Sequence, residues 1–351
     1  MTPYDAPSFP ADAPAVATPS SRAPLADGLG RAVRYLRLSV TDRCDLRCTY
    51  CMPERMTFLP RAEVLSLEEL ERVAALFIGL GARKLRLTGG EPLVRKGVLD
   101  LVARLGSRVG GGLDELTLTT NGTRLEAAAA ALAAAGVRRV NVSMDSLDPA
   151  TYRRLTRGGD LATVLRGIDA AQAAGLRVKV NAVALARDNR AELAGMVAWA
   201  HGRGLDITFI EAMPMGEVEA DRLDQHLSLQ AVRDELAATW TLTPLPDSTG
   251  GPARWLRVEE TGGRLGLITP MTHTFCDTCN RVRVTATGVL HTCLGRDDAT
   301  DLRTPMRDGA SDAELAALVR RAVLAKPAGH DFRLVPGAAP AVARHMSVTG
   351  G

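Results

Sequence analysis

Short runs of aliphatic and β-branched residues alternate with helical stretches between residues 35 and 211, and this alternation constrains the fold more than any other feature of the sequence. Such a pattern is typical of βα units, whose strands join into a parallel sheet covered by helices. We therefore predict an α/β fold. The expected strands lie at residues 35–40, 84–88, 115–120, 139–144, 177–184 and 206–211.

Local signals mark two of the helices between these strands. Ser66 and Glu69 have the spacing of a capping box, which predicts a helix start, and Gly81 predicts its end. The alanine-rich run at residues 125–135 favours a second helix, which Gly136 ends.

The chain divides into three segments that differ in composition and periodicity. We predict a flexible N-terminal extension at residues 1–30, because repeated prolines interrupt any periodic pattern there. Residues 31–243 carry the βα pattern. Residues 244–351 predict a smaller α+β module with two hairpins separated by glycine-containing turns. The expected hairpin strands are residues 255–260 with 264–269, and 282–285 with 289–292.

The charge balance argues against polyanionic partners. Lys and Arg exceed Asp and Glu by 43 − 40 = 3, which is too small an excess to indicate nucleic-acid or membrane-surface binding. No stretch approaches the roughly 18 apolar residues of a membrane span, and the N-terminal residues lack the features of a secretory signal. We therefore expect a cytoplasmic protein in which locally gathered basic residues can bind an anionic small molecule.

The cysteines indicate metal chemistry. They form two groups of three: the first cysteine group is Cys44, Cys48 and Cys51, and the second cysteine group is Cys276, Cys279 and Cys293. Disulfides are the plain alternative, but groups of three pair badly and no secretory signal accompanies them. Thiolates are soft ligands that suit zinc, copper(I) and iron-sulfur clusters. Metal or cluster ligation is therefore our interpretation.

Three thiolates leave a cluster incomplete. A [4Fe-4S] cluster normally takes four cysteines, so three leave one iron open to a small molecule such as S-adenosylmethionine (SAM). For the second cysteine group, a structural zinc site completed by His291 or His273 is the alternative.

Polar residues follow five of the six predicted strands, where the functional loops of parallel sheets lie. These segments are Thr41-Asp42-Arg43-Cys44, Gly89-Gly90-Glu91-Pro92, Thr119-Thr120-Asn121-Gly122, Ser143-Met144-Asp145-Ser146 and Glu211-Ala212-Met213-Pro214.

The first cysteine group, with Tyr50 before its last member and Gly89-Gly90-Glu91-Pro92 after the next strand, resembles the radical SAM superfamily. This resemblance implies a partial, incomplete TIM-type βα barrel of about six parallel strands. It also implies radical chemistry that the cofactor supplies and the protein directs.

Within that superfamily, residues 32–351 resemble the GTP 3',8-cyclase family. The residues that carry this resemblance are 36–44, 275–283 and the terminal Gly350-Gly351. The resemblance implies a lyase that converts GTP to (8S)-3',8-cyclo-7,8-dihydroguanosine 5'-triphosphate, the first step of molybdenum cofactor biosynthesis. In that reaction a deoxyadenosyl radical removes the hydrogen at C3' of GTP, and the carbon radical attacks C8.

The same resemblance implies cofactors and site residues. The first cysteine group would hold the [4Fe-4S] cluster that binds SAM, and the second would hold another [4Fe-4S] cluster facing guanine. The expected SAM contacts are Tyr50, Gly90, Ser143 and Met213. The expected GTP contacts are Arg37, Arg86, Thr119, Lys179, Arg281 and Arg283. The expected catalytic residues are Arg281, Arg283, Gly350 and Gly351, the last two in a tail that enters the active site.

Plainer alternatives exist for some of these roles. On strands, Arg37, Arg86 and Lys179 could instead face solvent, and the terminal glycines could be a frayed tail. The segment after Gly216 lacks a tryptophan that the family carries, so details of the segment covering the site do not transfer.

The resemblance also implies partners: a flavodoxin- or ferredoxin-type electron donor, a downstream cyclic pyranopterin monophosphate synthase, and a homodimer as one oligomeric state. Two other functions compete with the cyclase. One is another two-cluster radical SAM enzyme, such as a peptide maturase. The other is a non-catalytic iron-sulfur electron carrier or sensor.

Overall fold

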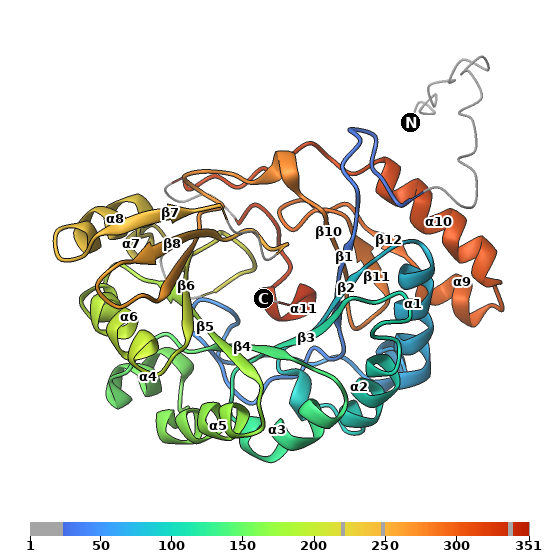
Figure 1. Ribbon diagram of the computed structural model, residues 1–351. Coiled ribbons are helices and arrows are strands. Elements are labelled where there is room, and N and C mark those ends of the chain that lie inside the picture. Colours follow the sequence, from blue (N-terminus) through green and yellow to red (C-terminus); the bar gives the residue numbers. More distant parts are fainter. Residues whose placement is uncertain (1–23, 219–221, 247–249, 336–339, 351) are drawn as a thin grey trace.

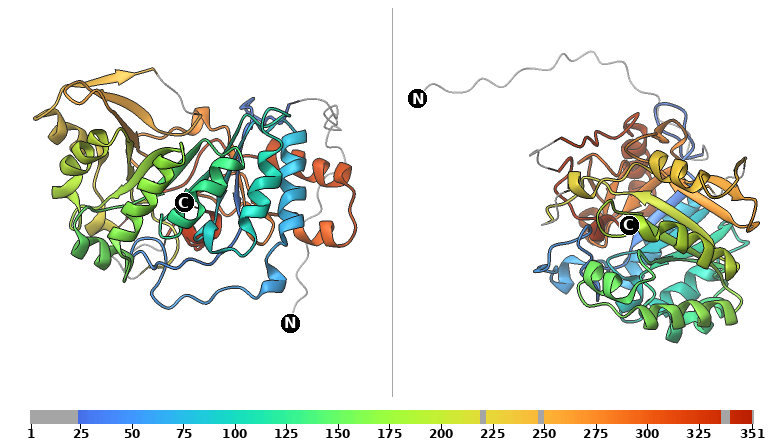
Figure 2. Two further views of the ribbon diagram at one scale, coloured as in Figure 1. Left: turned by 60° about the horizontal axis from the view of Figure 1, so that its bottom comes forward. Right: turned by 90° about the vertical axis from the view of Figure 1, so that its left-hand side faces the viewer.

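The computed structural model describes residues 24–218, 222–246, 250–335 and 340–350. Within these residues, twelve strands form one curved sheet in the order β12-β11-β10-β1-β2-β3-β4-β5-β6-β9-β8-β7. Most of the helices lie on the outside of the sheet, whereas the short C-terminal helix α11 (Met346–Thr349) lies near its centre (Figure 1). Figure 2 shows the same helical outer layer from two further directions.

The strands are β1 (Tyr35–Ser39), β2 (Lys84–Thr88), β3 (Glu115–Thr120), β4 (Arg139–Ser143), β5 (Arg177–Ala184), β6 (Asp206–Glu211), β7 (Leu242–Leu245), β8 (Arg254–Val258), β9 (Arg264–Ile268), β10 (Arg281–Val284), β11 (Val289–His291) and β12 (Thr300–Asp301). The helices are α1 (Leu67–Gly79), α2 (Val98–Gly106), α3 (Leu125–Ala134), α4 (Pro149–Thr156), α5 (Leu161–Ala173), α6 (Leu193–Gly202), α7 (Arg222–Gln225), α8 (Leu229–Ala237), α9 (Arg303–Arg307), α10 (Asp312–Leu324) and α11 (Met346–Thr349), with short 3-10 turns η1 (Arg61–Glu63), η2 (Pro92–Val94), η3 (Arg190–Glu192) and η4 (Cys276–Thr278).

The predicted parallel sheet is confirmed. Strands β1 to β6 pair in chain order, each parallel to the next. The predicted boundaries of four of these strands agree with the observed ones, and β1 and β4 each end one residue earlier than predicted. The fold is an open α/β barrel of the TIM type, as the resemblance implied.

The C-terminal strands extend this same sheet. Strands β8 and β9 form an antiparallel hairpin, and so do β10 and β11, as predicted. However, β9 also pairs parallel to β6 and β10 pairs parallel to β1, so the parallel part of the sheet grows at both sides. The hairpins therefore take part in the barrel wall, which their local sequence pattern does not reveal.

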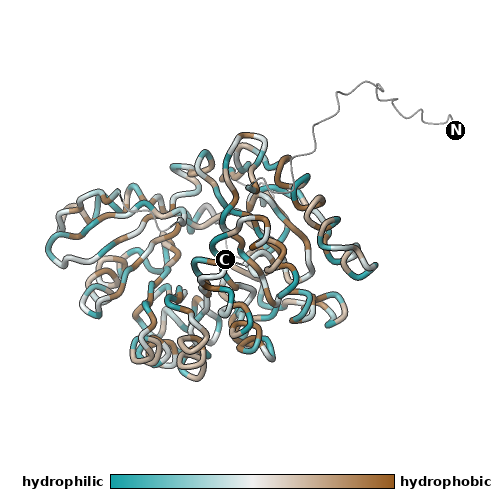
Figure 3. Tube along the Cα trace, turned by 45° about the vertical axis from the view of Figure 1, so that its right-hand side comes forward, coloured by the Kyte–Doolittle hydropathy of each residue, from teal (hydrophilic) through white to brown (hydrophobic). Residues whose placement is uncertain are grey.

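The core lies between the sheet and the outer helices. The side chain of Ser66 accepts from the backbone N–H of Glu69, and the Glu69 side chain accepts from the N–H of Ser66, so α1 begins with the predicted capping box. Helix α1 buries Leu70, Val73 and Phe77 in the main apolar cluster. The predicted alanine-rich helix is α3. Polar and apolar residues alternate along the outer helices, as amphipathic helices require (Figure 3).

Part of the predicted N-terminal extension is packed. Residues 1–23 lie outside the described residues. Leu25 is 2 % exposed, Ala26 pairs with Ala32 in an isolated bridge, and the N–H of Gly28 donates to the Leu324 carbonyl at 3.0 Å. The packed chain therefore begins before residue 31, because one apolar side chain and a short turn anchor it beside α10.

Among the described helices, none combines the length and the apolar character that crossing a lipid bilayer requires.

Two glycines that each end a helix provide a test of the packing between α2 and α3. A Cβ at Gly106 would lie 1.8 Å from the carbonyl oxygen of Ala135, whereas a Cβ at Gly79 would have nothing within 4 Å. We expect Gly106→Ala to lower the free energy of unfolding by about 1–3 kcal/mol, because the two helix ends must separate. Gly79→Ala should be neutral or stabilising by about 0.5–1 kcal/mol. Urea unfolding of both variants measures this, and equal effects would contradict the observed packing.

Candidate functional site

Both cysteine groups line one cavity. It has a volume of about 300 Å³, lies within the curve of the sheet, and is lined by Cys44, Cys48, Cys51, Cys276, Cys279 and Cys293. All six thiols are free, so the disulfide alternative is wrong. Two segments more than 200 residues apart in the sequence therefore contribute soft ligands to the same enclosed space.

The strand directions place the two groups at opposite edges of the sheet. The first group follows the carboxyl end of β1. Cys276 and Cys279 precede the amino end of β10, which runs parallel to β1, and Cys293 follows β11, which runs antiparallel to β10. The first group thus lies at the carboxyl edge of the parallel strands and the second at their amino edge, with the lumen of the barrel between them.

The first cysteine group lies in a loop whose backbone and side chains are already organised. The Cys44 sulfur accepts from the N–H of Leu46 at 3.4 Å and from the Asn121 amide at 3.7 Å. Burial raises the pKa of Cys44 to about 11 and that of Cys51 to about 12. At these pKa values the protein alone stabilises the thiolate forms only weakly. A soft metal centre can supply the missing positive charge when it binds the sulfur atoms in place of their protons.

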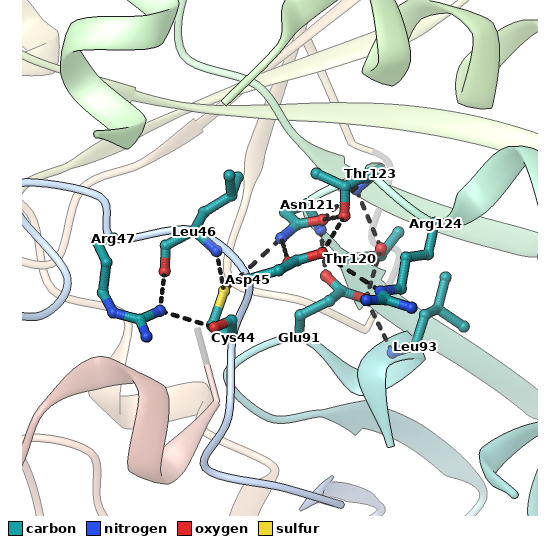
Figure 4. Close-up of polar contacts among 11 residues, drawn as sticks. Cys44, Asp45, Leu46, Arg47, Glu91, Leu93, Thr120, Asn121, Thr123 and Arg124 are labelled. Carbon is teal, nitrogen blue, oxygen red and sulfur yellow. Dashed lines mark hydrogen bonds and ion pairs between the residues drawn. The ribbon is translucent and has the colours of Figure 1, made fainter. Parts of the chain in front are cut away.

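Glu91 organises this loop from the neighbouring strand ends (Figure 4). Its carboxylate is fully buried and accepts from the N–H of Leu93 at 2.9 Å, the Thr120 hydroxyl at 2.9 Å and the N–H of Asn121 at 2.6 Å. The Asn121 amide in turn donates to Asp45 at 2.8 Å. The glutamate of the Gly-Gly-Glu-Pro segment therefore ties the ends of β2 and β3 to the first cysteine group.

The second cysteine group has different electrostatic surroundings. Burial alone would raise the pKa of Cys279, but the charges of Arg281 and Lys326 outweigh burial and lower it to about 7. Lys326 also lies within hydrogen-bonding distance of the Cys279 sulfur, at 3.5 Å. Positive groups thus face Cys279, whereas burial raises the pKa of Cys293, and the charge of Asp298 acts in the same direction.

The geometry around the second cysteine group bears on the alternative of a structural zinc site completed by a histidine. The Nδ1 atom of His291 is paired with the Asp298 carbonyl at 2.6 Å. Among the residues that the structure describes, no three Cys, His, Asp or Glu side chains converge as the ligands of a single metal ion do. The thiolates of a cubane cluster each bind a different iron atom, so cluster ligation does not require such convergence.

Basic side chains fill the lumen between the two groups. The strand register places Arg37 opposite Arg283 on one side and opposite Arg86 on the other. Arg86 and Lys179 are each 6 % exposed, and Arg86 donates to the Thr119 hydroxyl at 3.1 Å. Burial, and then the charge of Arg86, hold the pKa of Lys179 well below its usual range. The alternative in which these strand residues face solvent is therefore wrong for Arg86 and Lys179, while Arg37 is partly buried and lines the cavity.

These cations have unused hydrogen-bonding capacity. Within the described part of the chain, the Nε atoms of Arg86 and Arg283 are buried without a protein partner. Arg281, 7 % exposed, has its guanidinium 5.1 Å from the centroid of the Phe275 ring. A lumen lined by buried donors of one charge suits a multiply charged anion, because the anion supplies both the missing acceptors and the counter-charge.

The predicted SAM contacts also line this cavity: Tyr50, Gly90, Ser143 and Met213. The Tyr50 hydroxyl donates to Asp145 at 2.6 Å, and burial raises the pKa of that carboxyl to about 6. A Cβ at Gly90 would lie 2.4 Å from the Arg43 carbonyl oxygen. The close packing of the cysteine loop therefore requires glycine at position 90, whether or not a ligand also approaches its backbone.

The C-terminal tail enters the lumen. The Gly350 carbonyl accepts from Arg37 at 3.2 Å, and Thr349 is fully buried. Gly350 has φ +74°, and a Cβ there would lie 1.9 Å from the Thr88 hydroxyl oxygen. The frayed-tail alternative is thus wrong for Gly350, while Gly351 lies outside the described residues.

Two basic residues near the second group were missed in the sequence analysis. Lys326 is 5 % exposed and contacts Cys279. Arg31 donates to the Cys276 carbonyl at 2.8 Å and pairs with Asp27. Neither stands in a motif, so only the tertiary structure reveals these contacts.

Two family models match successive parts of the chain. Residues 38–200 match the radical SAM superfamily, and residues 205–332 match the family Molybdenum Cofactor Synthesis C. A GTP 3',8-cyclase from Caulobacter vibrioides is 66 % identical over 100 % of both chains. A GTP 3',8-cyclase from Rhodopseudomonas palustris (strain TIE-1) is 59 % identical over 93 % of this chain and 96 % of its own length.

Solved structures show the same fold at low identity. SuiB from Streptococcus suis bound to S-adenosylmethionine is 13 % identical, with a TM-score of 0.55 over 82 % of this chain and 69 % of SuiB. SuiB bound to its precursor peptide SuiA gives a TM-score of 0.58 at 13 % identity, over 83 % of this chain and 72 % of SuiB. These likenesses show the fold alone.

Glu91 provides a test of how the site is organised. Glu91→Ala removes the acceptor of the three donors described above, so we expect a loss of about 3 kcal/mol or more in stability. Glu126→Ala is the matched control, because the one ion pair that the Glu126 side chain forms within the described residues is exposed, with Arg166, and is worth about 1 kcal/mol or less. Melting temperatures of the anaerobically purified variants measure the difference. Similar melting temperatures would mean that Glu91 does not hold the strand ends together.

Proposed function

Because the chain belongs to the GTP 3',8-cyclase family within the radical SAM superfamily, we propose that its barrel lumen binds GTP and SAM together and directs the cyclisation of GTP. The protein is a radical SAM lyase of molybdenum cofactor biosynthesis, and its product is (8S)-3',8-cyclo-7,8-dihydroguanosine 5'-triphosphate. Its cofactors are two [4Fe-4S] clusters and SAM. The presence of two soft-ligand groups and a basic lumen in one cavity carries this proposal.

The residues present suit these cofactors. Cys44, Cys48 and Cys51 would hold one cluster, while the second cysteine group would hold the other. Each group offers three thiols to one cavity, which leaves one cluster iron open to a small molecule. When bound, the first cluster and SAM supply the radical that removes hydrogen from C3' of GTP.

At the carboxyl edge, the chain's own residues would fix SAM. Tyr50 is held by its hydrogen bond to Asp145, so its ring has one orientation beside the first cysteine group. Gly90 allows the Gly-Gly-Glu-Pro segment to pack directly on the cysteine loop. Ser143 ends β4 and Met213 follows β6. Both residues line the cavity, at the ends of strands other than the two that precede the first cysteine group and Gly90.

In the lumen, the basic residues would bind GTP. Arg37, Arg86, Lys179 and Arg283 are suited to the triphosphate, because arginine offers paired donors and lysine a compact charge. Thr119 supports Arg86 through its hydroxyl. Arg281 and Arg283 continue the row toward the second cluster, where guanine would lie. Enclosing both reactants excludes water and fixes their orientation, which can lower the barrier by about 7 kcal/mol or more.

The Gly-Gly tail would shape the substrate site. Gly350 contacts Arg37, one of the residues that we assign to GTP. The tail can therefore position this guanidinium and limit the room around the reacting atoms. Only a residue without a side chain fits beside Thr88 in the observed backbone conformation.

The family also suggests the protein's surroundings in the cell. We propose a cytoplasmic enzyme that receives electrons from a flavodoxin- or ferredoxin-type donor and passes its product to cyclic pyranopterin monophosphate synthase. A homodimer is the oligomeric state that we propose. The peptide-maturase and electron-carrier alternatives are not favoured, because relatives named as GTP 3',8-cyclases match over the full chain.

The first test is cofactor content and product. Anaerobically purified protein should contain about eight iron and eight sulfide per chain, as two [4Fe-4S] clusters require. Changing either cysteine group to alanine should halve both values. With reductant, GTP and SAM, the protein should form 5'-deoxyadenosine and a cyclised nucleotide, identified by chromatography and mass spectrometry. Zinc in place of iron, or 5'-deoxyadenosine formation that does not depend on GTP, would contradict the proposal.

The second test concerns the tail. Gly350→Ala should lower the rate of product formation by roughly a hundredfold or more, because the tail and Arg37 must move. Gly175→Ala is the matched control: Gly175 also has a positive φ, of +80°, but a Cβ there would have nothing within 4 Å. A residue appended after Gly351 should act like Gly350→Ala. Unchanged rates in both tail variants would show that the tail has no part in the reaction.

A further inference from the structure

Lys326 is a buried lysine at the second cysteine group. It follows α10 by two residues, is 5 % exposed, and its backbone N–H donates to the Val323 carbonyl at 3.0 Å. Lysine is rarely buried to this extent unless its charge is compensated. Its surroundings therefore need an explanation that α10 alone does not provide.

The ammonium group uses all three of its donors. It donates to the Cys279 sulfur at 3.5 Å, to the Arg281 carbonyl at 3.2 Å and to the Thr292 carbonyl at 2.5 Å. Cys279 ends the turn that begins at Cys276, Arg281 begins β10, and Thr292 immediately precedes Cys293. One side chain thus joins the segments that carry the second cysteine group.

The charge of Lys326 has one evident counterpart. Among the residues that the structure describes, Lys326 forms no ion pair with a carboxylate, and its partners are two neutral carbonyls and a sulfur. The neighbouring side chains Arg281 and Arg283 are positive as well, while Cys293 lies near the charges of both Arg344 and Asp298. The Cys279 sulfur, 3.5 Å from the ammonium nitrogen, is the one of these three partners that can carry a negative charge.

Arg31 fixes the segment after Lys326 in a different way. It donates to the Pro327 carbonyl at 2.6 Å and to the Ala328 carbonyl at 2.8 Å, and Asp27 neutralises its charge at 2.6 Å. Arg31 therefore holds the backbone in place, whereas the charge of Lys326 remains directed at the cysteine sulfur.

From this geometry we propose that Lys326 is a positioning residue that holds the second cysteine group in shape and raises the reduction potential of the cluster bound there. Adding an electron makes a cluster more negative, and a cation hydrogen-bonded to its ligand sulfur stabilises that state. The first cysteine group has the carboxylates of Asp45, Glu91 and Asp145 around it, whereas the charges that act on Cys279 are those of Arg281, Lys326 and Arg283. This inference rests on the proposed second cluster and assigns a residue that tunes it.

The experiment compares Lys326→Met and Lys326→Gln with the wild-type holoprotein. Potentiometric titration followed by electron paramagnetic resonance reports each cluster, because GTP should perturb only the second cluster and SAM only the first. In both variants we expect the reduced-to-oxidised ratio of the second cluster at the wild-type midpoint to fall at least tenfold, which corresponds to about 59 mV for a one-electron couple. The first cluster should keep its potential.

Arg321→Met is the matched control. Arg321 is an exposed cation on α10, the helix that precedes Lys326, and Arg321→Met has the same net charge as Lys326→Met. It should leave both potentials unchanged. If Lys326→Gln retained the wild-type potential while Lys326→Met did not, hydrogen bonding without charge would suffice, and the electrostatic part of the inference would be overturned.

Two further outcomes separate the hypotheses. A wild-type protein without a GTP-sensitive cluster signal would contradict the proposed function itself. A wild-type signal with an unchanged potential in both neutral variants would overturn the role of Lys326 alone. Should the neutral variants lose the second cluster, Lys326→Arg, which keeps the charge, should retain both the cluster and its potential, and an equal loss there would refute the inference.

Discussion

The parallel pairing of β1 with β10 is the contact on which the whole site depends. It joins a strand near the start of the chain to one near its end, and its register places Arg37 opposite Arg283 and Tyr35 opposite Arg281. Because the cysteines of the first group follow β1 while Cys276 and Cys279 precede β10, this one pairing also fixes the two groups at opposite ends of the lumen. Without it, the basic residues between them would not form a single row.

This arrangement has an electrostatic cost that the ligands can offset. Buried cations of one sign destabilise a folded chain unless anions or hydrogen-bond acceptors accompany them. Here the lumen holds Arg86 and Lys179 at 6 % exposure each, and Tyr35 lies close enough that the charges of Arg86 and Arg37 lower its pKa despite burial. A triphosphate bound in the lumen, as we propose, would provide further compensation. The excess of buried positive charge would therefore favour binding of the substrate.

Sequence reasoning succeeded where the information is local. The periodic runs of β2, β3, β5 and β6 gave their boundaries, and Ser66 with Glu69 gave the start of α1. It failed where the structure depends on long-range contacts. Nothing in residues 281–284 indicates that they pair with β1, and nothing around Lys326 distinguishes it from a surface lysine. The cysteine spacing and the family resemblance supplied the site, but the relation between its two ends came only from the sheet.

The pairing of β10 with β1 also accounts for the position of α11. Since β10 occupies the place beside β1, the chain after β12 runs along α9 and α10 on the outside and returns to the lumen through α11 (Figure 1). The returning segment meets Arg37 and Thr88, which lie on adjacent strands, so little room remains for a side chain at Gly350. The requirement for glycine at position 350 thus follows from the same strand pairing that assembles the two cysteine groups.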